Sequence, residues 1–290
     1  MRSARLQLNP EFPLCWEGTE TLRFGFEQPR LRLQSPTPAQ QRFISELIDG
    51  INDRELPSIA QKCGLSALEL TALLSLLEPV LAHLPASRHP SRTTQPRRTH
   101  KPNPEVLVFG VGEFVTTLCD NIAQSGVTVA SRAPTTLSQP APRSAPIAAC
   151  SFAIIVERFL GPTAVPQALY GEGVPHLPIC LTDTSMSIGP LVLPGGSPCL
   201  ACVEQHRVDA EPKIAVFATQ LLGLSPAAES PHCAELAAAI ILVAFRRWQQ
   251  DPESTQSARM RFPVQRGFPE FRSSFEVISP HPECACALFR

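Results

Sequence analysis

Two close pairs of cysteines, far apart in the sequence, constrain this chain more than any other feature. Cys199 and Cys202 are separated by two residues in SPCLACVEQHR, and Cys284 and Cys286 by one residue in HPECACALFR. A two-residue spacer lets one turn present both sulfur atoms to a single zinc ion, which four thiolates bind tetrahedrally. The tighter second pair can do the same from an extended segment. Four thiolates from two distant segments would then tie the end of the sequence to its middle.

Each cysteine pair alone has a second interpretation, as small buried thiols or as a surface redox pair. No apolar run of the signal-peptide kind follows the first residues, which predicts a cytoplasmic and reduced protein. In that compartment cysteines are more often thiols or metal ligands than disulfides. We therefore predict a closed, structural zinc site, with no catalytic role, whose ligands are Cys199, Cys202, Cys284 and Cys286.

Three polar residues near the cysteine pairs leave alternatives open. His281 lies three residues before Cys284 and could replace one of the thiol ligands. His206 and Asp209, three residues apart, could face one side of a helix as a catalytic dyad. The plainer interpretation is a polar first turn beside the metal site, so no catalytic residue is assigned.

A Pro-rich and Arg-rich stretch, Pro85–Pro104, divides the chain. It contains five basic residues, no acidic residue and no apolar periodicity, which is typical of an exposed linker. A basic arm that grips nucleic acid or an acidic peptide is the alternative. We predict a first domain at 1–85, a linker at 86–103 and a second domain at 104–290.

The first domain has the pattern of a winged helix, with strands followed by three helices. Thr21–Phe26 alternates polar and apolar residues, and a helix capped by Thr37 follows. A short helix, Leu56–Cys63, comes next. We treat the segment 66–84 as one third helix, which begins with a capping box formed by Ser66 and Glu69.

A winged helix can read DNA or bind an extended peptide at a sheet edge. The third helix has no Lys or Arg and carries Glu69 and Glu78, so it lacks the cations that DNA phosphates require. The net charge of −1 gives no argument for nucleic acid either. This favours a peptide groove between an edge strand and the third helix, with contacts from Leu31, Arg32, Leu33, Leu70 and Leu73.

The second domain begins with a βαβ unit of the dinucleotide-binding kind. The buried strand Val106–Phe109 is followed by Gly110 and Gly112, a helix near residues 114–123 and a strand near residues 127–130. Further apolar strands at residues 152–156 and 177–181 predict an α/β domain with a parallel sheet. Val115 stands where the nucleotide fingerprint has its third glycine, and no acid ends the second strand. Gly110 and Gly112 are therefore only a weak nucleotide loop, and ATP is not expected.

A second apolar segment lies near the end of the chain. The helix expected at Glu235–Trp248 is apolar nearly all round, which predicts that it is buried in the domain core or at a homodimer interface. Its apolar block, Leu236–Phe245, falls short of the roughly 20 residues that a membrane span needs, so no membrane partner is expected.

Several segments resemble one family. GPLVLPGGSPCLACVEQHRVDAEP, Gly189–Pro212, looks like a segment of the ThiF-like proteins of thiazole/oxazole-modified peptide biosynthesis, many of them actinobacterial. The motif HPECACA, His281–Ala287, is similar to the closing motif of that family. PEFPLCWEGTETLRFGF, Pro10–Phe26, and ELIDGINDRELPSIA resemble its peptide-recognition domain. The resemblance covers nearly the whole chain, and the two cysteine motifs are its most specific part.

The resemblance implies a winged-helix recognition element fused to a Rossmann-like domain of the ubiquitin-activating-enzyme type. In that family the first element binds the leader of a ribosomally made precursor peptide. The second domain holds zinc and docks a YcaO-type enzyme, which uses ATP to cyclise Cys, Ser or Thr side chains onto the backbone. The expected partners are thus a precursor peptide and a YcaO-family protein, with structural Zn²⁺ as the cofactor. An ATP-dependent adenylating enzyme and a winged-helix DNA-binding regulator are the two alternatives.

Overall fold

The computed structural model describes residues 4–85, 105–134, 150–160, 164–195, 198–252 and 258–286. The chain divides into two compact units, residues 1–99 (unit 1) and 100–290 (unit 2). The expected linker at 86–103 lies outside the described residues. In the described part no single helix is long and apolar enough to cross a membrane; the helices near 56–63 and 67–80 reach that length and hydropathy only together, as a pair bent by 106°.

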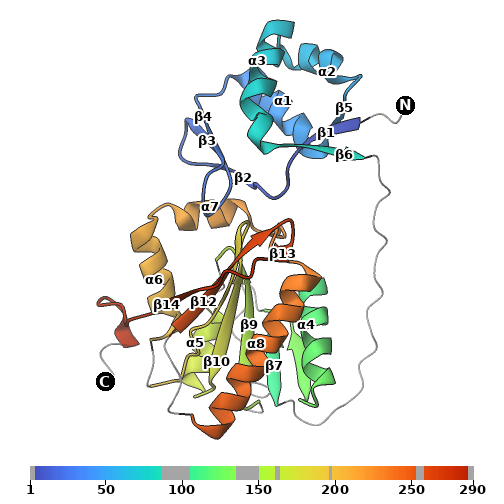
Figure 1. The fold of residues 1–290 in the computed structure, drawn as a ribbon. Helices are drawn as coiled ribbons and strands as arrows, with labels where there is room; N and C mark the ends of the chain where they lie inside the picture. Colours follow the sequence, from blue (N-terminus) through green and yellow to red (C-terminus); the bar gives the residue numbers. More distant parts are fainter. Residues whose placement is uncertain are drawn as a thin grey trace. The chain divides into compact units, whose positions relative to one another are not determined.

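The first helix of unit 1, α1 (Pro38–Asp49), begins where its capping residues predict (Figure 1). The Thr37 side chain accepts a hydrogen bond from the Gln40 backbone N–H, and the Gln40 side chain accepts one from the Thr37 N–H. This reciprocal pair satisfies two of the N–H groups that a helix start leaves without partners. Phe43 and Leu47 on its inner face are fully buried in the core of unit 1.

The next two helices also follow their expected boundaries at their starts. Helix α2 (Leu56–Cys63) ends at Gly64, whose φ of 90° places it in the left-handed region that glycine adopts without a Cβ clash. Helix α3 (Ala67–Leu77) begins with the expected capping box, in which Ser66 and Glu69 exchange side-chain to backbone hydrogen bonds. Local sequence is therefore enough to place these helix starts.

The third helix is shorter than the sequence suggests, and this prediction was wrong at its C-terminal end. The helix stops at Leu77, a single 3-10 turn (Glu78–Val80) follows, and Leu81–Pro85 forms strand β6. Pro79 explains the break, because it has no N–H to continue the helical ladder. The added strand pairs antiparallel with the first strand of the chain, a long-range contact that periodicity does not reveal.

Unit 1 contains two small antiparallel sheets, with strand orders β5-β1-β6 and β2-β3-β4. Strand β4 is therefore an end strand that pairs with β3. The buried side chains of both sheets and of the three helices form one core. The strands are β1 (Ala4–Leu8), β2 (Leu14–Trp16), β3 (Thr21–Phe24), β4 (Leu31–Gln34) and β5 (Ile51–Asn52).

Unit 2 is built on an eight-stranded mixed sheet, which corrects the expectation of a parallel sheet. Its order is β13-β12-β11-β10-β9-β7-β8, with β14 also paired to β12. Only β8, β7, β9 and β10 run parallel, and the other strands are antiparallel. The strands are β7 (Val106–Phe109), β8 (Val129–Arg132), β9 (Phe152–Arg158), β10 (His176–Leu181), β11 (Ser185–Ile188), β12 (Ala258–Gln265), β13 (Phe268–Pro269) and β14 (Ser274–Val277).

Helices cover both faces of this sheet (Figure 1). Alternate residues of β7 point to opposite faces: Val106 and Val108 pack with α4 and α8, whereas Leu107 and Phe109 pack with α5 and α6. The β7 strand is buried throughout because both of its faces are covered. The helices are α4 (Glu113–Gln124), α5 (Ala164–Gly171), α6 (Leu200–Ala210), α7 (Ile214–Gln220) and α8 (Pro231–Gln250).

The long helix α8 is buried on one face only, so the expectation that it lies wholly in the domain core was wrong, and its burial at a homodimer interface stays a prediction. Its inner residues, among them Ala237, Ile241 and Phe245, pack against the sheet and α4. Val243 on the outer face is 58% exposed. Apolar composition alone did not separate the two faces, because alanine is found in both environments.

Candidate functional site

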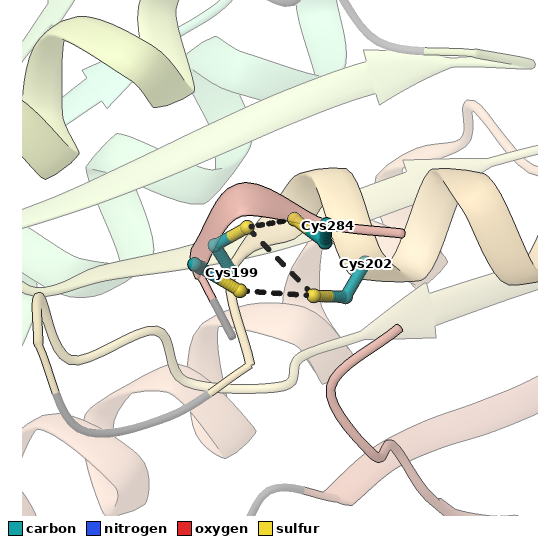
Figure 2. A group of neighbouring side chains, drawn as sticks. Cys199, Cys202 and Cys284 are labelled. Atoms are coloured by element: carbon teal, nitrogen blue, oxygen red, sulfur yellow. Dashed lines mark hydrogen bonds between the residues drawn. The ribbon is translucent and has the colours of Figure 1, made fainter. Parts of the chain in front are cut away.

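The four predicted zinc ligands lie together in unit 2, and their sulfur atoms all lie within 4.8 Å of one another. Figure 2 shows the side chains of Cys199, Cys202 and Cys284 converging on one point. The Sγ–Sγ distances are 3.9 Å for Cys199–Cys202, 3.5 Å for Cys199–Cys284 and 3.2 Å for Cys202–Cys286. A zinc ion with Zn–S bonds near 2.3 Å places its sulfurs about 3.8 Å apart. The donor set and its spacing therefore fit a tetrahedral zinc ion.

The start of α6 explains how the first pair of thiols is presented. Cys199 is the N-cap residue and Cys202 lies in the first turn, so both sulfurs sit at the positive end of the helix dipole. Backbone N–H groups of Cys202, His281 and Cys199 reach the sulfurs of Cys199, Cys202 and Cys286, respectively. Such N–H···S hydrogen bonds stabilise thiolates and orient metal ligands.

The cluster resists ionisation by itself. Burial raises the pKa of the Cys199 thiol, with the Cys284 and Cys286 thiols adding to the rise, and burial raises the pKa of Cys202 to about 11. Burial acts in the same direction on Cys286, but hydrogen bonds from the Cys199 backbone and the other thiols outweigh it and lower its pKa. A divalent cation would offset the repulsion between thiolates, so metal binding would release protons.

The segment that carries the second cysteine pair runs along α6. Cys202, His206 and Asp209 lie on one side of this helix, at spacings of four and three residues. The His206 Nε2 atom lies 3.0 Å from the Ser279 carbonyl oxygen, and the His281 Nε2 atom lies 2.9 Å from Asp209 Oδ2. The catalytic-dyad alternative is not supported, because His206 and Asp209 contact this segment and not each other.

His206, Asp209 and His281 also lie close enough to hold an ion, but their hydrogen bonds disfavour one. The Glu283 backbone N–H donates to His281 Nδ1 at 3.2 Å, so the ring proton is on Nε2 and is donated to Asp209. A metal would need the Nε2 lone pair. His281 lies with His206 and Asp209 and not within the thiol cluster, and both of its ring nitrogens are engaged by these hydrogen bonds, against the alternative in which it replaces a cysteine ligand.

The glycine-rich turn after β7 is closely packed. A Cβ on Gly110 would lie 2.7 Å from Val115 Cγ2 and 3.1 Å from Val156 Cβ. Gly110 is thus required for packing of the strand against the helix, whether or not a nucleotide binds. Gly112 has a φ of 105°, and a Cβ there would meet Arg158 and Glu229.

An internal ion pair lies at this turn, at the carboxyl ends of the neighbouring parallel strands β7 and β9, where the strand order reverses. Arg158 Nε donates to Glu229 Oε2 at 2.7 Å, Arg158 Nη2 contacts Glu229 Oε1, and the same nitrogen donates to the Val111 carbonyl at 2.7 Å. The point where the strand order reverses is the usual ligand crevice of open α/β sheets. The Arg158 guanidinium, which could otherwise meet a phosphate, is held by a carboxylate of the chain itself.

Beside Arg158 lies a buried acidic residue. Burial raises the pKa of Glu157 to about 8, the nearby Glu204 adds to the rise and Arg207 opposes it. Arg207 is anchored separately, because its Nη2 donates to the Phe159 carbonyl at 2.7 Å and its Nη1 to Glu204 at 3.2 Å. Helix α6 is thereby fixed to the end of β9, which positions the cysteine-bearing start of that helix.

Replacing Glu157 with glutamine should stabilise the protein at pH 8 by about 4 kcal/mol and by less than about 1 kcal/mol at pH 5. The pKa of this carboxyl is about 8 in the folded protein and 4.5 in an unfolded chain. The free energy of unfolding therefore falls as the pH rises from about 4.5 to 8, because the unfolded chain releases the proton and the folded protein keeps it. Urea unfolding at several pH values would measure the difference, with the exposed Glu172→Gln as control. A loss of stability at every pH would show instead that Glu157 is ionised and paired with Arg207.

The residues predicted for peptide contact are mostly in the core of unit 1. Leu33, Leu70 and Leu73 are buried, so their side chains do not form a contact surface, and this part of the prediction needs correction. Leu33 alternates with Arg32 and Gln34 in its strand, and Leu70 and Leu73 lie three residues apart on the inner face of α3, which is the apolar periodicity that the sequence shows. Leu31 is half-buried, and Arg32 is exposed and bonded to Glu17.

Strand β4 is nevertheless the end strand of its sheet among the described residues. Thr21 faces Gln34 in the β3–β4 ladder, and the Ser35 N–H bonds to the Glu20 carbonyl. Hydrogen-bonded and non-hydrogen-bonded pairs alternate in an antiparallel ladder, so the backbone groups of Arg32 and Gln34 point away from β3. These groups can accept a further strand.

The sequence analysis missed the residues whose contact partners lie far away in the sequence. Arg158 and Glu229 are 71 positions apart, and His206 and Ser279 are 73 apart. The position of Arg158 at the end of an apolar strand is a signal that could have drawn attention to it. Nothing in the local sequence identifies its partner.

No family model and no curated protein sequence matches this chain. Several solved structures are similar to it. One described as a heterocyclase in complex with substrate and cofactor is 12% identical, with a TM-score of 0.43 over 98% of this chain and 39% of that chain. The heterocyclase TruD is 16% identical, with a TM-score of 0.44 over 98% of this chain and 42% of that one. The chain thus spans about two-fifths of the length of these two proteins.

A chain of the E. coli microcin synthetase McbBCD complex is also similar, at 10% identity and a TM-score of 0.42, over 97% of this chain and 100% of that one.

Proposed function

We propose that this chain is the substrate-recognition subunit of an azole- or azoline-forming cyclodehydratase. Unit 1 would bind the leader of a precursor peptide, and a separate YcaO-type enzyme would carry out the ATP-dependent cyclisation. The observation that carries the proposal is the position of β4 at the end of its sheet among the described residues, with the backbone groups of Arg32 and Gln34 on the side away from β3. An extended peptide adds to such an edge through backbone hydrogen bonds. The sequence resemblance described above points to the same activity.

The outer surface of α3 supports a peptide ligand over DNA. The helix contains no Lys or Arg, and Leu68 on it is 82% exposed. Glu69 and Glu78 add negative charge at its two ends. An apolar and acidic surface suits a peptide with aliphatic side chains, whereas it offers nothing to neutralise phosphates.

Unit 2 supports a partner role without ATP chemistry of its own. The Arg158 guanidinium could have held a phosphate in the crevice beside Gly112, but it is paired with the Glu229 carboxylate. A zinc ion at the four thiols would have all four coordination positions filled by protein ligands, which is typical of a structural site. The zinc, when bound, would fix the segment with Cys284 and Cys286 onto α6.

Binding of the intact chain to precursor peptides would test this function. Fluorescein-labelled synthetic peptides, taken from the short reading frames that neighbour the gene, would be titrated with the protein and followed by anisotropy. We expect one of them to bind at about micromolar concentration or below, while scrambled versions do not. Matched titrations with ATP and, at low salt, with duplex DNA should be silent. Silence with every peptide, or tight salt-sensitive binding to DNA, would contradict the proposal.

A further inference from the structure

A cavity of about 670 Å³ lies in unit 2 between the C-terminal half of α8 and the strands β10, β11, β12 and β14. Its volume is in the range of pockets that bind small molecules. Leu177 and Ile188, which line it, belong to the core on the α8 side of the sheet, whereas α6, which carries Cys202, packs on the other face. The cavity is therefore distinct from the thiol cluster, and every residue that lines it belongs to unit 2.

Part of the cavity wall is backbone, at the point where the end of β11 meets the start of β12. Gly189 has a φ of 93°, and a Cβ there would lie 2.8 Å from the Ala258 carbonyl oxygen. Glycine permits this close approach because it has no Cβ. Backbone cannot rotate inward as a long side chain can, so the hollow stays open at this point.

Two of the lining side chains are apolar and yet largely exposed. Val243 on α8 is 58% exposed, and Phe275 on β14 is 69% exposed. Leu191, Ile240 and Met260, which are less exposed, continue the apolar lining. Phe275 is the single aromatic residue among the described residues of the lining. A ligand with an aliphatic body therefore matches the cavity and would remove these side chains from water.

The polar side chains of the lining all lie at the end of α8: Arg247, Gln250 and Asp251. Among the described residues, the Arg247 guanidinium has no ion pair, whereas Asp251 already has a partner within the chain. The planar guanidinium matches a carboxylate through two parallel hydrogen bonds. A single cation beside an acidic residue suits an anion with one charge and disfavours a phosphate group, which carries nearly two.

The position of Arg247 sets the length of ligand that fits. Arg247 and Ala239 both line the cavity and are eight positions apart on α8, which corresponds to about 12 Å along the helix axis. An extended aliphatic chain advances roughly 1.25 Å for each carbon–carbon bond of about 1.5 Å, so about ten carbon atoms cover this distance.

We propose that the cavity binds an aliphatic monocarboxylate of about ten carbon atoms, with its carboxylate on Arg247 and its chain directed toward Ala239. The Gln250 amide, three positions after Arg247, can donate a further hydrogen bond to the carboxylate. The chain would cover Val243 and Phe275. The inference goes beyond the proposed peptide recognition and does not depend on it, because no residue of unit 1 or of the thiol cluster takes part.

A chain-length series on the intact protein tests the apolar part of the site. Hexanoate, octanoate, decanoate and dodecanoate, each below the concentration at which it forms micelles, would be titrated by isothermal titration calorimetry. Each added methylene should lower the dissociation constant about fourfold up to about ten carbon atoms, and dodecanoate should gain little more. Affinity that does not depend on chain length, or an undiminished gain from decanoate to dodecanoate, would overturn the inference.

Arg247→Met tests the carboxylate contact, because methionine keeps an unbranched side chain and removes the charge. The dissociation constant of decanoate should rise at least about tenfold, while that of 1-decanol, which has no carboxylate, should stay the same. Arg246→Met is the matched control, since Arg246 is the neighbouring residue, is exposed and does not line the cavity. Equal weakening by the two substitutions, or decanoate binding that is unchanged in Arg247→Met, would refute the proposed contact.

Ala239→Trp tests the direction of the chain. The indole would occupy the far end of the cavity, so the gain in affinity should stop at a chain shorter than decanoate. Val216→Trp on α7, which is exposed and does not line the cavity, is the control. Circular dichroism would show that both variants remain folded. A chain-length profile that Ala239→Trp leaves unchanged would place the ligand elsewhere and overturn the inference.

The acyl chains of a membrane lipid have the same aliphatic chemistry as a free carboxylate, and flotation separates the two sources. Vesicles of phosphatidylglycerol, which present acyl chains beneath an anionic headgroup, should leave the protein in the unbound fraction. Protein that floats with these vesicles and does not bind free decanoate would contradict the proposal and assign the cavity to a membrane lipid.

Discussion

Serine in place of Cys284 will cost the protein its zinc and lower the melting temperature of unit 2 by roughly 10 °C. Serine keeps the size of the side chain but supplies no thiolate, so the site loses one of four ligands and the ion loses its tetrahedral shell. Loss of a structural metal belongs to the few changes that destabilise by several kcal/mol, and each kcal/mol is worth about 2–4 °C in a unit of this size. Metal analysis of reduced protein and a thermal scan measure the two effects.

The matched control is Cys119→Ala on α4. Cys119 lies outside the cluster of four thiols, so its loss should leave the zinc content unchanged. Chelator treatment of the unaltered protein should reproduce the Cys284→Ser melting curve. Unaltered protein without zinc, or a Cys284→Ser variant that keeps it, would contradict the assignment of the metal centre.

Proline in place of Arg32 will weaken leader-peptide binding by between about tenfold and a hundredfold. The proline ring removes the Arg32 N–H that points away from β3 and places bulk on the edge that the peptide would join. A lost backbone hydrogen bond is worth about 1 kcal/mol, and the steric block adds to it. Anisotropy titration with the peptide identified for the unaltered chain gives the ratio directly.

Arg32→Ala separates the backbone from the side chain. It removes the Arg32–Glu17 pair, whose nitrogen to oxygen distance is 2.6 Å, but keeps the backbone N–H. Because such exposed pairs contribute less than about 1 kcal/mol, the alanine variant should bind within about fivefold of the original. Equal binding by the proline and alanine variants would show that the peptide does not join this edge.

Local physical chemistry explains what the sequence could predict. Thr37 and Ser66 mark helix starts because a side-chain oxygen there replaces a missing backbone partner. Cys199 and Cys202 identify a thiol cluster because their spacing fits one ion. In each case the information lies within a few residues or in the chemistry of one residue type.

What escaped prediction depends on contacts between distant segments. Strand β6 exists because it pairs with β1, and the antiparallel half of the large sheet exists because β12 lies between β11 and β14. The spacing of Leu70 and Leu73 marks an inner face of the helix, but the distant residues against which that face packs leave no signal in the local sequence. The pairing of Arg158 with Glu229 produces no periodic pattern in the sequence, because neither residue is an unusual type for its position.

The separation of the two cysteine pairs has a consequence for how the protein is made. Cys199 and Cys284 are 85 positions apart, so a long loop must close before all four sulfurs meet. Helices within that loop can form beforehand, because their contacts are local, whereas distant contacts delay folding. Metal capture would thus come late, and until then the bare thiols are open to oxidation by peroxide or to mixed disulfides. A cell that synthesises this protein without enough zinc would accumulate chains oxidised at these sulfurs. Such chains would not bind zinc that is supplied afterwards.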